Sequence, residues 1–508
     1  MVYYKKDIIC LCLIYCLGQD TFPKGRTMMT NWLIEVYPLV ISIAVYAVGL
    51  VIFFENRSPH RTLYWLLVLA FLPVIGLLFY LFFGRSSSRY KFFWKMGHHD
   101  IPYLKKRLEK SRGSVDYLLN NTVSLHEKKR LSRIISATSP SFVTFNNQCR
   151  VLNNGREKFP AIFEAIKNAK HHIHLEYFIV QNDEVGNDLK KLLMEKASRG
   201  VKVRFLYDGL GSRKLGRRYL NSLHKSKVET AAFMPLTLPV PSTWMNYRNH
   251  RKILIVDGEI GFLGGINIGE EYIDGGKRFP SWRDVHLEIR GDALDILQGV
   301  FISDWQFTTG KIIEEEGCFP HRDPIGNKAV QIAASGPDGN WEAIHHAYFT
   351  AIATARETIY ITTPYLILDD SISTALKAAA LGGVDVKIVF PGKPDHRIVY
   401  WASYSYFADL LRAGVKIYLY QKGFIHAKTL TVDSQVTVIG TANMDMRSFY
   451  YSFEINAFIY DEEITQQLER TFEEDLSNSV AVDFEEYLKR PIYVKFKESG
   501  ARLLSPLL

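Results

Sequence analysis

Two stretches of the 508-residue sequence repeat one pattern of residues that could carry phosphoryl chemistry. Each contains a histidine, a lysine two positions later, an aspartate after four further residues, and an asparagine that ends a glycine-led turn. The two sets are His250, Lys252, Asp257 and Asn267, and His426, Lys428, Asp433 and Asn443. The residues between lysine and aspartate are mainly apolar, which predicts a β-strand in each copy. A histidine and a lysine two positions apart then share one face of that strand.

The paired histidines and lysines suit the displacement of a group on phosphorus. Histidine titrates near neutral pH and can act as a nucleophile or as a proton donor, and a lysine ammonium is a point charge suited to a phosphate oxygen. An asparagine adds a neutral donor to the same oxygens. One copy would form only half of a site. Two copies facing one another would place one histidine on each side of the phosphorus, as in-line displacement requires.

A single histidine–lysine pair on a strand has a plainer explanation, because such pairs arise by chance and usually have a structural role. Two copies that share the downstream glycine and asparagine argue against chance. From about residue 139 to its end, the chain resembles the phospholipase D superfamily, whose signature is this doubled motif. With the N-terminal segment described below, the resemblance narrows to the bacterial cardiolipin synthases.

The resemblance implies two duplicated α/β domains that share one active site. One histidine would attack the phosphorus of a phosphatidyl donor to give a phosphohistidine, and the other would protonate the leaving alcohol and then deprotonate the acceptor. It favours His250 as the nucleophile and His426 as the general acid, although the two copies are equivalent in sequence. The equatorial oxygens would be stabilised by Lys252, Lys428, Asn267 and Asn443. Donor and acceptor would both be phosphatidylglycerol, and the products would be cardiolipin and glycerol.

Two carboxylates downstream of the motifs are candidates to orient the histidines. A nucleophilic histidine needs an acceptor for its second ring nitrogen, which holds the tautomer and raises the basicity. Asp284 and Glu454 each lie on a strand-like stretch after a motif, at positions that resemble the orienting carboxylates of the superfamily. An exposed strand carboxylate is the alternative. Asp257 and Asp433 complete the catalytic motif, and the resemblance implies that their part in it is structural.

A repeated order of elements precedes each motif. Patterns of helix, strand, helix and strand run from residue 159 to 203 and again from 351 to 386. This alternation predicts α/β units with a mainly parallel sheet, used twice. The predicted domains are 139–325 and 326–508, joined within a stretch rich in glycine, proline and charge.

The N-terminal region predicts a membrane hairpin. Residues 36–54 and 62–84 contain no charged residue, and each stretch is long enough for a transmembrane helix. Neither stretch has a polar face, which argues against a pair of buried globular helices. Residues 32–84 are therefore predicted to form two transmembrane helices. Residues 1–31 are predicted to be an extension, with an uncleaved signal-like stretch as the alternative.

Residues 85–138 form a basic segment after the hairpin, and the whole chain has a net charge of +9. Positive charge beside a membrane span predicts a multi-pass protein of the cell membrane with its catalytic domains in the cytoplasm. The predicted partners are phosphatidylglycerol and anionic membrane lipid. A nucleic-acid surface would also be basic, but the position next to the predicted spans favours lipid over nucleic acid.

The cysteines and histidines do not predict a metal site. Five cysteines and fifteen histidines show no disulfide framework and no metal-ligand spacing. The roles given above require neither a metal nor another cofactor, so none is predicted. The sequence leaves the oligomeric state open.

Three other functions compete with the synthase. A phospholipase D hydrolase or a phosphatidylserine synthase would share the site and differ in the acceptor, and the membrane hairpin favours the synthase. The hairpin also disfavours a nuclease of the same superfamily. A non-catalytic membrane scaffold would not need two complete sets of site residues.

Overall fold

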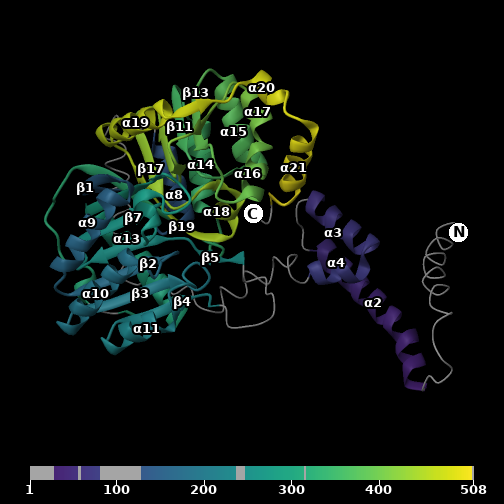
Figure 1. Cartoon of the computed structure of the whole chain (residues 1–508), viewed down its shortest axis with the longest axis horizontal. Coiled ribbons are helices and arrows are strands. Elements are labelled where there is room, and N and C mark those ends of the chain that lie inside the picture. Colours follow the sequence, from purple (N-terminus) through teal and green to yellow (C-terminus); the bar gives the residue numbers. More distant parts are fainter. Residues whose placement is uncertain (1–27, 55–58, 81–127, 236–245, 314–315, 506–508) are drawn as a thin grey trace. The chain divides into compact units, whose positions relative to one another are not determined.

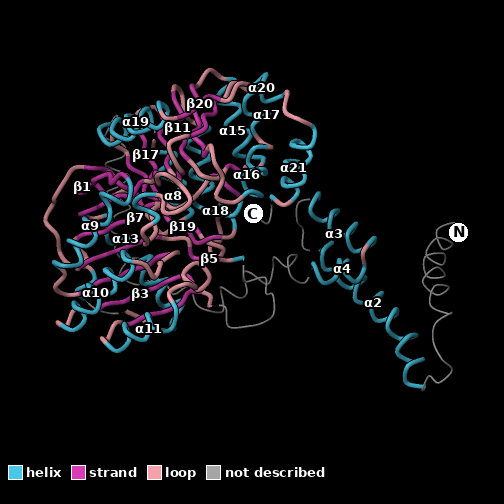
Figure 2. Tube along the Cα trace, viewed as in Figure 1, coloured by secondary structure: helices cyan, strands magenta, loops and turns pink. Residues whose placement is uncertain are grey.

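The computed structural model describes the chain outside residues 1–27, 55–58, 81–127, 236–245, 314–315 and 506–508. The chain divides into two compact units, Met1–Ser88 and Arg89–Leu508. Figure 1 labels the elements of both units, and Figure 2 shows helices, strands and loops in separate colours. Most of the predicted extension and most of the predicted basic segment lie outside the described residues.

The described part of the first unit is a small group of packed helices. These helices are α2 (Met28–Phe54), α3 (Pro59–Phe71) and α4 (Pro73–Phe79). Ile52, Leu69 and Tyr80 form a buried cluster that joins them. Gly76 permits close approach within the group, since a Cβ there would lie 2.8 Å from the carbonyl oxygen of Val68.

The second predicted span is not one helix. Helix α3 ends at Phe71, Leu72 leaves the helical region with φ −132° and ψ 67°, and a new helix begins at Pro73. Proline lacks a backbone N–H and clashes with the preceding turn, so it starts a helix more readily than it continues one. The prediction of a continuous helix over residues 62–84 is therefore wrong. By length and hydropathy, none of the described helices meets the requirement for crossing a membrane, so the transmembrane prediction is not confirmed.

One 16-stranded sheet runs through both halves of the second unit. Its order is β20-β14-β13-β11-β16-β17-β19-β10-β1-β9-β7-β6-β2-β3-β4, and β5 pairs with β19. The order is symmetric about the β10–β1 pair, since each half contributes an equivalent series of strands. The first-half strands are β1 (Thr144–Asn153), β2 (His172–Tyr177), β3 (Lys202–Asp208), β4 (Glu229–Phe233), β5 (Arg248–Asn249), β6 (Lys252–Val256), β7 (Ile260–Gly264), β8 (Trp282–Arg283) and β9 (Val285–Gly291).

The second half repeats this series. Its strands are β10 (Lys328–Ser335), β11 (Thr358–Thr362), β12 (Leu366–Ile367), β13 (Asp385–Pro391), β14 (Lys416–Tyr420), β15 (Phe424–Ile425), β16 (Thr429–Val432), β17 (Val436–Gly440), β18 (Met444–Asp445), β19 (Ser452–Ile459) and β20 (Ser479–Ala481). Because β1 and β10 pair directly, the two halves share a continuous sheet. The domain boundary between residues 325 and 326 stays a prediction.

The sheet is mixed, so the prediction of a mainly parallel sheet is wrong. Within it, β2, β3 and β4 run parallel, as do β11, β13 and β14, whereas the strands from β6 to β9 and from β16 to β19 pair antiparallel. The turns that follow the motif strands account for two of the antiparallel pairs, β6–β7 and β16–β17. Asp257 and Gly258 have φ of 55° and 65°, and Asp433 and Ser434 have φ of 52° and 49°. Such tight turns join antiparallel neighbours.

Helices cover both faces of the sheet around the motif strands. In β6, Leu254 and Val256 pack with helices α9 to α11, and the alternate residues Ile253 and Ile255 pack with helix α13. The first-half helices are α8 (Lys129–Thr138), α9 (Asn154–Asn168), α10 (Glu184–Ser198), α11 (Gly216–Lys225), α12 (Glu271–Asp274) and α13 (Ala293–Thr309). The second-half helices are α14 (Ala343–Ala353), α15 (Asp370–Leu381), α16 (Arg397–Tyr404), α17 (Phe407–Arg412), α18 (Met446–Tyr450), α19 (Glu462–Ser477), α20 (Phe484–Leu488) and α21 (Ile492–Leu503).

Candidate active site

Each motif histidine is held by the backbone of the opposite half. Strand β5, just before His250, runs parallel to β19 of the second half, and the His250 N–H donates to the Phe453 carbonyl at 2.9 Å. Strand β15, just before His426, runs parallel to β8 of the first half, and the His426 N–H donates to the Arg283 carbonyl at 2.7 Å. The two motifs are thereby brought into one site.

The orienting carboxylates are exchanged between the halves. Nδ1 of His250 lies 2.9 and 3.0 Å from the two carboxylate oxygens of Glu454, and Nδ1 of His426 lies 2.7 Å from Oδ2 of Asp284. Both carboxylates are fully buried. An Nδ1–H that donates to a carboxylate leaves Nε2 with its lone pair for chemistry. The sequence predicts both carboxylates as orienting residues, and in the structure each contacts the histidine of the other motif.

Burial makes both histidines weak bases. It lowers the pKa of His250 and of His426 to about 4, although the carboxylate beside each ring opposes the shift. Burial alone would raise the pKa of Glu454 and Asp284, but cationic neighbours and the histidines outweigh it, and the net shift of both carboxyls is downward. At neutral pH the site therefore contains two neutral imidazoles, each next to an ionised carboxylate.

The two lysines link the halves electrostatically. Nζ of Lys252 donates to the His250 carbonyl at 2.6 Å, and Nζ of Lys428 donates to the His426 carbonyl. Burial lowers the pKa of Lys252 to about 7, and the charge of Lys428 acts in the same direction. Burial lowers the pKa of Lys428 to about 8. A bound phosphate would offset this cost, since an opposite charge nearby raises the pKa of an ammonium group.

The two motif asparagines are buried in different local networks. Asn267 accepts a hydrogen bond from the Ile179 N–H at 3.2 Å through its side-chain oxygen. The Asn443 N–H donates to the Ser448 hydroxyl at 3.1 Å, and its side chain also bonds to Asp445. Both residues lie beside their motif strands, and their contact with a phosphate stays a prediction.

The motif aspartates lie at the far end of the motif strands from the histidines. Asp257 accepts from the backbone N–H groups of residues 170, 171 and 172. Asp433 accepts in the same way from residues 356, 357 and 358. Each carboxylate therefore ties the turn after its motif to the start of the neighbouring strand. This geometry suits a structural role and places neither motif aspartate beside a motif histidine.

Other supporting residues were not singled out from the sequence. Arg251, the residue between the histidine and the lysine, donates through Nε to the Glu454 carbonyl at 3.2 Å and pairs with Asp304. Phe178 packs edge-on against His250 with ring centroids 5.0 Å apart, and Trp282 lies 5.1 Å from His426. The position of Trp282, two residues before Asp284, is the signal that could have identified it.

Three potential metal ligands do come together, contrary to the expectation from their spacing. The ligand atoms of His172, His174 and Cys318 lie within 4.8 Å of one another. Both ring nitrogens of His174 are already in contact, one with Arg204 at 3.2 Å and the other with Gln298 at 2.7 Å. A metal ion would have to displace these partners, so the cluster is better suited to a packed polar network.

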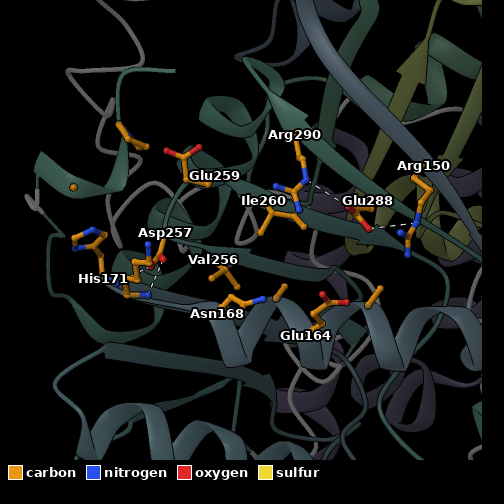
Figure 3. Close-up of a pocket in the computed structure, with 15 residues that line it drawn as sticks. Arg150, Glu164, Asn168, His171, Val256, Asp257, Glu259, Ile260, Glu288 and Arg290 are labelled. Atoms are coloured by element: carbon orange, nitrogen blue, oxygen red, sulfur yellow. Dashed lines mark hydrogen bonds and ion pairs between the residues drawn. The ribbon is translucent and has the colours of Figure 1, made fainter. Parts of the chain in front are cut away.

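A cavity of about 700 Å³ lies at the Asp257 turn, where His171 also lines it, and not at the motif histidines His250 and His426 (Figure 3). Figure 3 shows Arg150 and Arg290 on either side of Glu288, with distances of 3.4 and 3.5 Å between the charged groups. Its lining mixes both signs of charge, and it contains none of the predicted catalytic residues except Asp257. The cavity is therefore distinct from the histidine pair.

Comparison with known proteins first identifies the class of protein to which this chain belongs. The crystal structure of phosphatidylserine synthase from Haemophilus influenzae Rd KW20 matches with a TM-score of 0.58 at 16% identity, covering 75% of this chain and 100% of that chain. At this identity the likeness is one of fold. The family described as "Cardiolipin synthase, PLD-like domain" matches residues 162–276 and 348–476, and "Phospholipase D-nuclease N-terminal" matches residues 42–85. Fold and motifs together define a phospholipase D-like protein.

Proteins of similar sequence identify the family within this class. A cardiolipin synthase of Geobacillus sp. (strain WCH70) is 46% identical over 474 residues, which are 92% of this chain and 93% of that protein. Cardiolipin synthase 2 of Bacillus anthracis is 44% identical over 469 residues, 92% of this chain and 90% of that protein. The chain belongs to the cardiolipin synthase family of the phospholipase D superfamily, and it is an enzyme, a phosphatidyltransferase.

Proposed function

We propose that the enzyme transfers a phosphatidyl group from one phosphatidylglycerol to another, giving cardiolipin and glycerol. The observation that carries this proposal is the exchanged pairing of His250 with Glu454 and of His426 with Asp284. Two neutral imidazoles with free Nε2 atoms, close to two buried lysines, suit a phosphodiester anion that is attacked from one side and released on the other.

The reaction runs in two displacements. Nε2 of His250 attacks the phosphorus, and the bond from phosphorus to the glycerol oxygen breaks as His426 protonates that oxygen. The anionic substrate raises the pKa of His426 and so supplies the protonated form that this step needs. Neutral His426 then takes the proton of a hydroxyl of the second phosphatidylglycerol. That oxygen attacks the phosphorus, the phosphorus–nitrogen bond breaks, and both histidines return to their starting states.

The site requires a local excess of lipid acceptor, because water can also hydrolyse a phosphohistidine. We propose that the first unit supplies it by anchoring the enzyme in the cell membrane, with the catalytic unit in the cytoplasm. Helices α2, α3 and α4 expose large apolar side chains, including Tyr46, Phe54 and Phe71 at 76%, 76% and 79%. The basic sequence after residue 84 would attract anionic lipid on that side.

A labelled-substrate assay tests the transfer. Full-length protein in vesicles that contain phosphatidylglycerol with a labelled head group should release glycerol and form cardiolipin, in the presence of a chelator. The variant His250→Ala, prepared in the same way, controls for contaminating lipases. Formation of phosphatidic acid without cardiolipin would identify a hydrolase instead.

A further inference from the structure

Helix α21 carries an exposed apolar stripe opposite its packed face. Glu498 and Ala501 are only 4% and 5% exposed, whereas Ile492, Phe496 and Leu503 are 85%, 79% and 83% exposed. Residues of an α-helix follow one another at about 100°, so these three apolar side chains fall within one narrow stripe. Clustered exposed apolar side chains of this size mark an interaction surface.

Helix α21, which carries these exposed apolar side chains, is firmly attached to the rest of the second unit. Arg490 pairs with the buried Glu498 at 2.9 Å. Arg502 donates to the Ser405 carbonyl at 3.3 Å, and its guanidinium lies 4.6 Å from the ring centroid of Tyr406. In Figure 1, α21 lies beside α16. The apolar stripe is therefore presented outward by a docked helix.

Cationic side chains lie on both sides of the exposed face of α21. At about 100° per residue, Lys495 and Arg502 lie about 60–80° from Ile492 on one side, and Lys497 lies on the other side beyond Tyr493, which is 61% exposed. All three are exposed. Arg502 already contacts Ser405 and Tyr406, so the two lysines are the cationic side chains that would face lipid. Long cationic side chains can extend their charged ends to lipid phosphates while apolar neighbours enter the acyl region. An apolar stripe with basic borders is the pattern of a helix that lies in the interface of an anionic membrane.

The helix that supports α21 also leads to the active site. Helix α16 begins directly after Asp395 and His396. The Tyr365 hydroxyl donates to Asp395, and the charge of Asp395 raises the pKa of Lys428 against the effect of burial. A surface bound through α21 is thus connected through one helix to the neighbourhood of the second motif.

We propose that α21 is an interfacial membrane helix, with Ile492, Phe496 and Leu503 inserted into an anionic bilayer. This second attachment, independent of the first unit, holds the catalytic unit against the lipid that contains its substrate. The proposal extends the proposed function, because a lipid substrate gives the attachment its use. The basic borders match an anionic bilayer, whereas a second copy of the chain would present the same positive charge to α21.

Fluorescence quenching tests the insertion directly. Phe496→Trp and the control Leu381→Trp are each placed in full-length protein in phosphatidylglycerol-containing vesicles with brominated acyl chains. Leu381 is 74% exposed on helix α15, which is fully described and has no other large exposed apolar residue. We expect quenching beyond the wild-type signal for Trp at position 496 and none at position 381. Equal behaviour at both positions, or protection at position 496 by contact with a second copy, would overturn the proposal.

Activity on two forms of substrate tests the consequence. The triple variant Ile492→Ser, Phe496→Ser and Leu503→Ser should lose roughly tenfold in turnover on vesicles, since attachment sets the local lipid concentration. It should retain wild-type turnover on detergent-dispersed phosphatidylglycerol, which also shows that it folds, and Leu381→Ser should be unaffected in both assays. Equal losses in both assays would contradict membrane docking. A wild-type enzyme that forms no cardiolipin would refute the proposed function, while the quenching result would still decide the docking.

Discussion

The two halves of the active site give their histidines the same kind of support in different surroundings. His250 faces both oxygens of Glu454, whereas His426 faces one oxygen of Asp284, whose other oxygen accepts from the Val285 N–H at 2.8 Å. Burial nevertheless lowers the pKa of both histidines to about 4. Burial shifts both pKa values in the same direction, so the shifts do not distinguish the nucleophile from the general acid.

The aromatic surroundings of His250 and His426 differ more than the hydrogen bonds of these two histidines do. One ring, Phe178, packs edge-on against His250, whereas Trp282 and Phe424 lie 5.1 and 5.9 Å from His426. An aromatic wall excludes water from a reacting group. Residues outside the motif thus give the two equivalent histidines different aromatic neighbours.

Removing either histidine should have the largest effect. His250→Ala and His426→Ala should each reduce turnover by at least about 10⁴-fold, and the double variant should be little worse, because the two residues act as one unit. Turnover of phosphatidylglycerol by all three variants provides the measurement. Losses that multiply in the double variant would mean that the halves act independently.

A donor with an acidic leaving group sharpens the comparison of roles. If His426 is the general acid, the first turnover of p-nitrophenol release from a phosphatidyl ester should be nearly normal in His426→Ala, since that leaving group needs no proton. Later turnovers should stall, because His426 is also the base of the second displacement. The same release should stay abolished in His250→Ala. Acid-quenched protein should carry the phosphatidyl adduct on His250 by mass spectrometry, and an adduct on His426 would reverse the roles.

Substitution of the exchanged carboxylates should have the next largest effect on turnover. Glu454→Gln and Asp284→Asn should each lower turnover by about 10²- to 10⁴-fold, because an amide does not hold the required tautomer. With the p-nitrophenyl donor, the first turnover of Asp284→Asn should return to nearly normal, because Asp284 contacts the general acid His426. The first turnover of Glu454→Gln should stay slow, because Glu454 contacts the nucleophile His250. Recovery of the opposite variant would contradict the pairing across the halves.

The pH dependence should reveal the lysines as well as the histidines. For the free enzyme, kcat/KM should fall below about pH 4, where the nucleophile becomes protonated, and should decline above that pH as His426 loses the proton of the general acid. The decline should become steeper above about pH 7, where Lys252 loses its charge. Lys252→Arg keeps its charge at all these pH values and should move the alkaline limb toward the pKa of about 8 of Lys428. An unchanged alkaline limb in this variant would assign it to another group.

Substitution of the motif aspartates should have the smallest effect on the chemical step. Asp257→Ala removes an acceptor of three backbone hydrogen bonds and should lower the free energy of unfolding by about 2–3 kcal/mol. Asp433→Ala should do the same in the second half. Thermal unfolding of both variants measures the loss, with the exposed Glu259→Gln in the same turn as the control. A loss of turnover as large as that of the histidine variants, without a loss of stability, would give these aspartates a direct catalytic part.

The periodic features of the chain could be predicted from sequence. The doubled spacing identifies the histidines and lysines, and the strand-like stretches after each motif identify Asp284 and Glu454. Strand direction could not be predicted from the alternation of helices and strands alone. The positive φ angles at Asp257 and Asp433 make hairpins there, and these reverse the direction of the following strand. Likewise, Pro73 breaks a stretch whose hydropathy alone predicts one helix.

The sequence by itself determined which residues can perform the chemistry, because residue type and spacing are local properties. The tertiary structure alone decided that Glu454 serves His250 and that Asp284 serves His426. That pairing depends on β5 joining β19 and on β15 joining β8. Backbone hydrogen bonds between strands are the same for any residue, so side-chain patterns along the chain do not specify which distant strands meet; the packing of the two halves around one shared sheet does.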